Sequence, residues 1–213
     1  MLKGGTALLL AHELPRHSTD LDFDSAKKLN IEGRLRAGLA EAGVEVASMD
    51  LRKDSATVQR FMIHYHERGA AGDTTLLKVE TSFRPPSPDA AVIEARGIRT
   101  YDIPTLYDQK LEALEGRTAP RDLFDVAHMT ERYGDRLRAD QIQRADGASR
   151  DLDGLVGRFD RAFQDDSLLT RMRATAEDET LRLREGVERE IGVRRERERT
   201  ASREREVDDG YGL

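Results

Sequence analysis

Alternation of polar and apolar residues along the first half of the chain predicts β-strands, because successive side chains of a strand point to opposite faces. The clearest case is STDLDFD at 18–24, where three aspartates fall on one side and Leu21 and Phe23 on the other. Three more segments alternate in this way, at 44–51, 57–66 and 75–83, the last of them after the turn-like GAAGD at 69–73. We therefore expect a sheet with one acidic strand face, which the polar face of the last segment joins if the two strands are neighbours.

Helical spacing of apolar residues predicts helices around these strands. They cover 6–14, 26–43, 107–117 and 122–134. Pro15 ends the first, since proline disfavours helix in the residue before it, and Gly43 ends the second. Beyond position 150, the segment 155–174 predicts one or two packed helices. The stretch 182–209 interleaves opposite charges with few apolar residues, so we expect a solvated helix that frays into disorder.

A proline-rich segment, RPPSPD at 84–89, fits neither a helix nor a central strand. It divides a mixed N-terminal part from a helical C-terminal part, into which the extended GIRTYDIP at 97–104 leads. We predict three regions from this organisation: a core at 1–88, a helical domain at 89–175 and a charged helix or tail at 176–213.

Composition narrows the function classes. The 213-residue chain has no cysteine, which excludes disulfide and thiolate chemistry, and no long apolar run or apolar leader. We expect a soluble, cytoplasmic protein without a membrane partner. The net charge of −6 argues against a general polyanion binder. Basic residues still gather at 27–28, 34–36, 52–53 and 132–150, either as solvated faces or as a selective nucleic-acid contact.

The acidic strand and the first helix suggest a nucleotide site. Asp20 and Asp22, two residues apart on one strand face, lie roughly 6 to 7 Å apart at the backbone, close enough to share a divalent cation. Upstream, Gly4 and Gly5 let the backbone approach a phosphate, the helix N-terminus presents N–H groups and Thr6 adds a hydroxyl. Each feature is weak alone, but together they predict a turn that holds a triphosphate and carboxylates that hold its metal.

The order of motifs resembles a known family. KGGTAL followed by RHSTDLDF is similar to the AbiEii/MenT family of toxin nucleotidyltransferases, relatives of the DNA polymerase β-like transferases. Three further motifs agree, KVETS at 78–82, DQKLEALEGR at 108–117 and RDLFD at 121–125, so the resemblance runs from residue 3 to about 130. It implies an α/β (α+β) fold, a polymerase-β-like mixed sheet with helices followed by a helical C-terminal portion, whose helical domain completes the active site.

The resemblance also implies residue roles. Asp20 and Asp22 would be catalytic metal ligands, with Glu80 as the third carboxylate. In a site with two Mg²⁺ (or Mn²⁺) ions, one ion activates the acceptor hydroxyl and the other stabilises the leaving pyrophosphate. Lys110 and Asp125 complete the implied catalytic set. The implied nucleotide-binding residues are Gly4, Gly5, Thr6, Ser18, Lys78, Arg117 and Arg121.

As function, the resemblance implies a toxin of a toxin–antitoxin pair. Such an enzyme transfers a nucleoside monophosphate from an NTP, with CTP as one candidate, to the 3′ acceptor end of tRNA, which blocks aminoacylation and translation. The implied partners are an NTP, tRNA and a cognate antitoxin protein. Two alternatives stay open: a nucleotidyltransferase that modifies a protein or small molecule, and a non-catalytic binding module with a vestigial metal site whose charged C-terminal helix holds a partner.

Several of these residues also have a purely structural interpretation. Lys110 and Arg117, seven positions apart, share a helical face as a common ligand requires, or they are ordinary charges on an exposed helix. Arg121 and Asp125, four positions apart, are site residues or a surface ion pair. Lys78 contacts a phosphate or only balances the glutamate two residues later.

The histidines carry less information. His64 and His66 share a strand face, but no third ligand is near in the sequence, which disfavours zinc. We interpret His12 and His17, on either side of the glycine–aspartate loop, as polar loop residues, and His128 as a histidine at the edge of a helical core.

The family usually has a segment before the glycine motif, whereas only Met1, Leu2 and Lys3 precede Gly4 here. We expect the core sheet to lack a normal edge, to be completed by a partner through self-association, or to reflect a shortened start.

Overall fold

The computed structural model describes residues 1–67 and 72–210, with side chains up to residue 203. Contacts divide the chain into two compact units, Met1–Leu106 and Tyr107–Leu213. The first unit is built on a mixed sheet and the second is helical. The strands at 92–95 and 98–101 belong to the first unit, beyond the proline-rich segment. Our three sequence-based regions stay a prediction.

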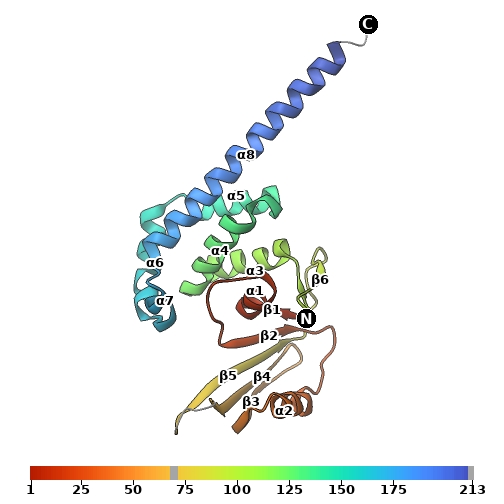
Figure 1. Ribbon diagram of the computed structural model, residues 1–213, viewed down its shortest axis with the longest axis vertical. Coiled ribbons are helices and arrows are strands. Elements are labelled where there is room, and N and C mark those ends of the chain that lie inside the picture. Colours follow the sequence, from red (N-terminus) through yellow and green to blue (C-terminus); the bar gives the residue numbers. More distant parts are fainter. Residues whose placement is uncertain (68–71, 211–213) are drawn as a thin grey trace. The chain divides into compact units, whose positions relative to one another are not determined.

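A seven-stranded mixed sheet forms the first unit, in the order β3-β4-β5-β2-β1-β7-β6 (Figure 1). Its strands are β1 Leu2–Lys3, β2 Asp20–Asp24, β3 Glu45–Asp54, β4 Val58–His66, β5 Thr74–Ser82, β6 Val92–Ala95 and β7 Ile98–Tyr101. Strands β3, β4 and β5 run antiparallel, and β2 pairs parallel with β5. This arrangement confirms the four strands predicted from alternation and the expected neighbourhood of β2 and β5. The turn at 69–73 lies partly outside the described residues.

The two-residue strand β1 occupies an interior position between β2 and β7. Leu2 is opposite Phe23 on one side and opposite Thr100 on the other. The expectation that the sheet lacks a normal edge is therefore wrong, because its edges are β3 and β6. Strand β1 therefore joins β2 to β7 within the sheet.

One face of the sheet carries the core of this unit. Phe61, Ile63 and Val79 are buried there. Partly buried apolar residues pack around them: Leu21, Phe23, Ile31, Leu35, Leu39, Val46, Met49 and Leu77. Helix α2, Glu32–Glu41, contributes Leu35 and Leu39 to this set and lies beside β3 and β4 (Figure 1). Because Leu21 and Phe23 face this core, the aspartates of β2 face the opposite side.

Helix α2 is shorter than the predicted 26–43. It begins at Glu32, since the Ser25 hydroxyl donates a hydrogen bond to the Lys27 carbonyl and accepts one from the Lys27 N–H in a local turn. Such side-chain to backbone hydrogen bonds compete with helix formation. Helix α1, Gly4–His12, is also displaced from the predicted 6–14, and its C-cap residue Glu13 adopts the left-handed conformation.

The second unit is helical, and its boundary falls inside helix α3, Ile103–Gly116. The following elements are α4 Pro120–Tyr133, the short 3₁₀ turn Gly134–Arg136, α5 Ala139–Ala148, α6 Leu152–Asp165, α7 Ser167–Met172 and α8 Ala176–Gly210. The predicted helices at 107–117 and 122–134 are confirmed, and 155–174 forms two helices. Helix α5 lies within the basic region 132–150, where no helix was predicted.

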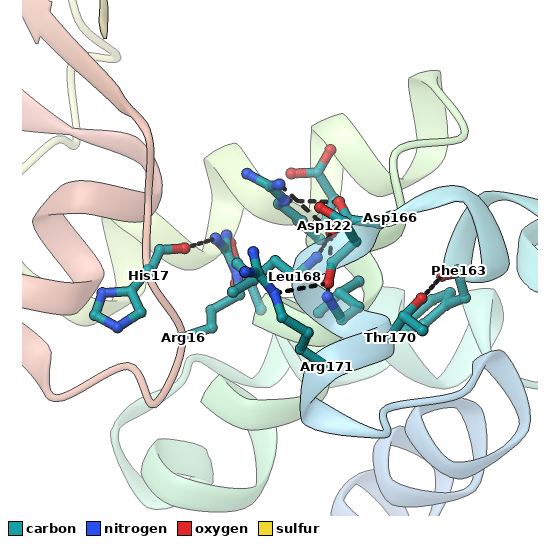
Figure 2. Close-up of polar contacts among 12 residues, drawn as sticks. Arg16, His17, Asp122, Phe163, Asp166, Leu168, Thr170 and Arg171 are labelled. Carbon is teal, nitrogen blue, oxygen red and sulfur yellow. Dashed lines mark hydrogen bonds and ion pairs between the residues drawn. The ribbon is translucent and has the colours of Figure 1, made fainter. Parts of the chain in front are cut away.

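Helices α6 and α7 are separated at Asp166. Its side chain accepts hydrogen bonds from the backbone N–H groups of Leu168 and Leu169 and so caps α7 (Figure 2). Thr170 then donates a hydrogen bond back to the Phe163 carbonyl (Figure 2). These contacts explain why one amphipathic stretch forms two helices.

Helix α8 differs most from its prediction. Ala176, Thr180, Leu183 and Val187 are fully buried. They recur every three or four residues, so they form one narrow stripe that packs on α4, α5 and α6. The prediction of a solvated helix is wrong for the start of the stretch 182–209, where Leu183 and Val187 are buried. A few apolar residues are enough to pack a helix when all of them lie on one face. The helix continues to Gly210, and the fraying of its end stays a prediction. Among the helices that the structure describes, none is long and apolar enough to cross a membrane.

Candidate functional site

The carboxylates of β2 and β5 share one face of the sheet. In the parallel register, Asp20 lies opposite Lys78 and Asp22 opposite Glu80. Residues that face each other on neighbouring strands point to the same side, so the structure brings together the side chains of the predicted metal ligands. This confirms that Asp20, Asp22 and Glu80 share one sheet face.

The third aspartate of β2 has a structural role. Only 8% of the Asp24 side chain is exposed, and Lys3 Nζ lies 2.7 Å from its Oδ1. The Tyr101 hydroxyl donates a hydrogen bond to Oδ2 at 2.9 Å. These contacts join β2 to β1 and β7.

The glycine turn lies directly against this carboxylate face. Gly4 has a φ of +69°, and a Cβ atom there would come within 3.0 Å of Asp22 Oδ2. A Cβ at Gly5 would come within 3.0 Å of Arg16 Nη2 and 3.1 Å of Ser18 Oγ. A side chain at either glycine would thus collide with the candidate site. The structure confirms that the turn and the carboxylates, far apart in the sequence, are close in space.

Thr6 was expected to offer its hydroxyl to a phosphate, but in the structure this hydroxyl already has a hydrogen-bond partner. The Thr6 side chain is buried and donates a hydrogen bond to the Asp20 backbone carbonyl. This bond fixes the first turn of α1 to the start of β2. Because α1 already begins at Gly4, its N-terminal N–H groups lie at the glycine turn, where an anion is favoured.

The environment of Asp22 shifts its pKa. Burial raises its pKa above the ordinary value, Lys78 opposes the shift, and the negative charges of Asp20 and Glu80 add to it. Ionised Asp22 is therefore held in an unfavourable environment that a bound cation would relieve.

Basic side chains neutralise the two carboxylates beside it. Lys78 Nζ lies 2.6 Å from Asp20 Oδ2, and Arg60 Nη2 lies 2.6 Å from Glu80 Oε2. The alternative that Lys78 only balances Glu80 is therefore wrong. Arg60 was missed in the sequence, although its position in the alternating β4 segment places it on the polar face. Only the register with Glu80 shows its importance.

The residues present fit a divalent cation in their chemistry. Asp20, Asp22 and Glu80 offer the oxygen ligands that Mg²⁺ prefers. Among the side chains that the structure describes, in residues 1–67 and 72–203, no three of His, Cys, Asp or Glu are already arranged to hold a metal ion. Asp20 and Glu80 would have to exchange their present basic partners for the cation.

A second charged cluster lies in the helical unit, on α3 and α4. Lys110 Nζ lies 2.9 Å from Asp122 Oδ1 and 2.7 Å from Asp125 Oδ2. Arg117 Nε lies 2.7 Å from Oδ2 of Asp122, which is labelled in Figure 2. Lys110 on α3 and Arg117, directly after the end of α3, both contact the Asp122 carboxylate. Their predicted sharing of a substrate stays a prediction. The alternative of ordinary charges on an exposed helix is wrong for Lys110, which is 12% exposed.

Burial and charge compete at this cluster. Burial lowers the pKa of Lys110, but the carboxylates of Asp125 and Asp122 outweigh it and raise the pKa above its ordinary value. Burial likewise raises the pKa of Asp122, but Lys110 and Arg117 outweigh it, and the net shift is downward. Both groups are held in their charged forms.

Arg121 and Asp125 do not form the surface ion pair considered for them. The Asp125 side chain is fully buried, whereas Arg121 Nε lies 2.8 Å from Asp166 Oδ2. Arg121 therefore contacts the residue that caps α7.

The histidines separate into different environments. His12 is not a loop residue, because it ends α1, is buried and lies with Nε2 3.2 Å from the Tyr101 carbonyl oxygen. His17 is exposed in the loop, as expected, and its carbonyl accepts a hydrogen bond from Arg16 (Figure 2). His64 and His66 lie on β4 opposite Leu76 and Thr74.

His128 lies at the edge of the helical core, as predicted. It is 9% exposed on α4, and burial and Arg182 lower its pKa. Its Nδ1 lies 3.1 Å from Arg182 Nη2.

Comparisons with known proteins show the family of this chain. The family model described as nucleotidyl transferase AbiEii toxin, type IV toxin–antitoxin system, matches residues 1–208. No curated protein matches the chain.

Several solved structures are similar. A Helicobacter pylori protein described as a candidate nucleotidyltransferase is 33% identical over 89% of this chain and 85% of its own, with a TM-score of 0.80. JHP933 from Helicobacter pylori is 30% identical over 96% of this chain and 89% of its own, with a TM-score of 0.85.

The nucleotidyltransferase toxin MenT4 from Mycobacterium tuberculosis has a TM-score of 0.54 at 19% identity, over 88% of this chain and 73% of its own, and shows a similar fold. The family match covers nearly the whole chain and includes the glycine turn, the carboxylate strand and the helical motifs described above. The chain belongs to the AbiEii family of nucleotidyltransferase toxins of toxin–antitoxin systems.

Proposed function

We propose that this nucleotidyltransferase transfers a nucleoside monophosphate from an NTP to the 3′ acceptor end of tRNA, with Mg²⁺ or Mn²⁺, and thereby blocks aminoacylation and translation in the cytoplasm. The observation that carries the transfer reaction is the closeness of Gly4 to Asp22, on a face shared by Asp20 and Glu80: a Cβ added at Gly4 would lie 3.0 Å from Asp22 Oδ2. The tRNA acceptor is supported by the family resemblance, and CTP is the first nucleotide to test. A cognate antitoxin counteracts the enzyme.

The chain's own groups divide the work at this site. Gly4 and Gly5 let the backbone approach a triphosphate, and the first turn of α1 directs N–H groups toward it. Ser18, half-buried beside Gly5, offers a hydroxyl to the same phosphates. Lys78 adds positive charge at Asp20. Asp20, Asp22 and Glu80 would hold the divalent cations, which supply charge stabilisation at the reacting phosphate and acidify the acceptor hydroxyl.

The Lys110 cluster has a different proposed role. Lys110 is occupied by two buried carboxylates, so we assign to it and to Asp125 the positioning of α3 against α4. Arg117 keeps 64% of its side chain exposed, and we assign to it a contact with a phosphate of the nucleotide. Arg121, held by Asp166, is 32% exposed and is a weaker candidate for the same contact.

The transfer reaction is tested directly. Purified protein is incubated with total tRNA, Mg²⁺ and each α-labelled NTP in turn, beside Asp20→Asn and Asp22→Asn variants. Label on tRNA that requires both aspartates supports the proposal and identifies the nucleotide. Growth arrest without labelled tRNA would contradict the acceptor and direct the search to labelled proteins and small molecules.

A further inference from the structure

The carboxylate face of the sheet continues beyond the candidate site onto β4 and β3. Glu80 on β5 lies opposite Arg60 on β4, and Arg60 lies opposite Lys53 on β3. Together with Asp22, these side chains form one row across four strands, here called the charged row. At about 4.8 Å between strands, the row is roughly 14 Å long.

A β-bulge directs Lys53 into this row. The register shifts between Leu51, which is opposite Phe61, and Lys53, which is opposite Arg60. Phe61 belongs to the buried core face. In a regular strand, positions 51 and 53 would share that face, so the extra residue turns the lysine to the carboxylate side. The bulge on the edge strand β3 therefore places one basic side chain on the same side of the sheet as the candidate site.

Charge along the row changes from negative to positive. The Arg60 side chain is 40% exposed although it pairs with Glu80. Lys53 is exposed, and within the described part of the chain it has no acidic partner. An anion that approaches Asp22 along this row would therefore meet an uncompensated lysine first. A cation that binds Glu80 would also free Arg60 from its ion pair with Glu80, so that Arg60 could contact the same anion.

Apolar and flat side chains lie beside the charged row on the same face. Met62 is opposite Lys78, and His64 is opposite Leu76. Leu76 is 42% exposed, whereas Met62 and His64 are half-buried. Their chain neighbour Ile63 is fully buried on the core face. This side of β4 and β5 is thus a partly apolar surface next to the carboxylates.

We propose that Lys53, Arg60, Met62, His64 and Leu76 form an acceptor face that binds the single-stranded end of the RNA substrate. Lys53 and Arg60 contact its phosphates, and His64 with Met62 supports an unstacked base, which leaves the terminal hydroxyl at Asp20 and Asp22. Single-stranded nucleic acids are bound in this way, by a positive track along the backbone and side chains on which bases stack. The inference rests on the proposed transfer to RNA and names the surface that receives it.

Binding without catalysis tests the acceptor face. Fluorescence anisotropy of a labelled, short single-stranded RNA with a free 3′ hydroxyl is measured with Mg²⁺ but without NTP, over a series of salt concentrations. The variants are Lys53→Ala and His64→Ala. Arg34→Ala is the matched control, because it removes one exposed charge from α2, which packs on the opposite face.

The two variants should weaken binding through different physical terms. Lys53→Ala should lower the slope of log Kd against log salt by about 0.7, the value for one phosphate contact of a single strand. His64→Ala should raise Kd roughly fivefold or more, with the salt slope unchanged, since stacking is not an ionic contact. Arg34→Ala should bind as the unmodified protein does.

The outcomes separate this inference from the proposed function. Unchanged RNA affinity in both variants, with native circular dichroism, would overturn the acceptor face even if aspartate-dependent labelling of tRNA is found. Loss of RNA affinity in both variants would support the face, even if no NTP labels any RNA and the transfer proposal fails.

Discussion

Lys110 Nζ lies 2.7 Å from Asp125 Oδ2, and the Asp125 side chain has no exposed surface. Removing one partner of a buried ion pair is strongly destabilising, because the remaining buried charge loses the opposite charge that offset its desolvation. Asp122 accepts from the same ammonium group at 2.9 Å, so Lys110 holds two carboxylates of α4. A motif that the sequence presents as phosphate-binding therefore also stabilises the helical unit.

Lys110→Met should lower the free energy of unfolding by about 3 to 5 kcal/mol, the typical cost of removing one partner of a buried pair. Urea denaturation followed by circular dichroism measures this. Lys27→Met, at an exposed position, is the control and should change stability by less than about 0.5 kcal/mol. A Lys110→Met variant as stable as the control would show that the pair contributes little.

The stability of the helical unit should also fall in acid. Because the folded-state pKa of Asp122 is lowered, its contribution is complete above the ordinary aspartate pKa, near 3.9, and is lost as pH falls through the folded value. Thermal unfolding between pH 6 and pH 3 should show this loss, and Asp122→Asn should remove that part of it. Asp165→Asn, at a side chain that is 74% exposed, is the control and should keep the acid profile of the unmodified protein.

Asp22→Asn should lower the rate of nucleotidyl transfer by at least about a hundredfold, which is the typical effect of removing one charge-stabilising group at a reaction centre. It should also raise the melting temperature without metal. The raised pKa of Asp22 means that its ionised form opposes folding at neutral pH, and a neutral amide removes that cost. Mg²⁺ should then stabilise the unmodified protein more than the variant. A lower melting temperature for Asp22→Asn would contradict this interpretation.

Gly4→Ala should impair both stability and transfer. Alanine at a φ of +69° costs about 1 to 2 kcal/mol, and its Cβ would press on Asp22 Oδ2. Gly97→Ala is a matched control, since Gly97 has a φ of +73° but no heavy atom within 4 Å of the added Cβ. The control should lose similar stability and keep its transfer rate. Equal rates in the two variants would show that the Gly4 contact is not functional.

Leu183→Ala on α8 should destabilise the helical unit by about 2 to 4 kcal/mol, because Leu183 is fully buried. Leu181→Ala, two residues earlier and 43% exposed, should cost less than about 0.5 kcal/mol. Chemical denaturation of both variants compares them. Similar losses would mean that the buried stripe of α8 does not support the unit.

Local patterns were sufficient for much of the fold. Alternation placed β2 to β5 within a few residues, because one face of each strand packs on a core. Strands β1 and β6 are only two and four residues long, which is too short for any period to appear. Helix α8 was misjudged because its few buried residues are dispersed among charges, and only their packing against α4, α5 and α6 reveals the stripe.

The family, the glycine turn and the predicted carboxylate pair Asp20 and Asp22 could be recognised from residue types at short spacing. Which charges meet could not be predicted without strand register and helix packing. Arg60 reaches Glu80 through strand register, Lys53 reaches the carboxylate side through a bulge, and Lys110 reaches Asp125 through the packing of α3 on α4. The physical reason is that ion pairs depend on distances of a few ångströms, which pairing and packing fix and which no local spacing encodes.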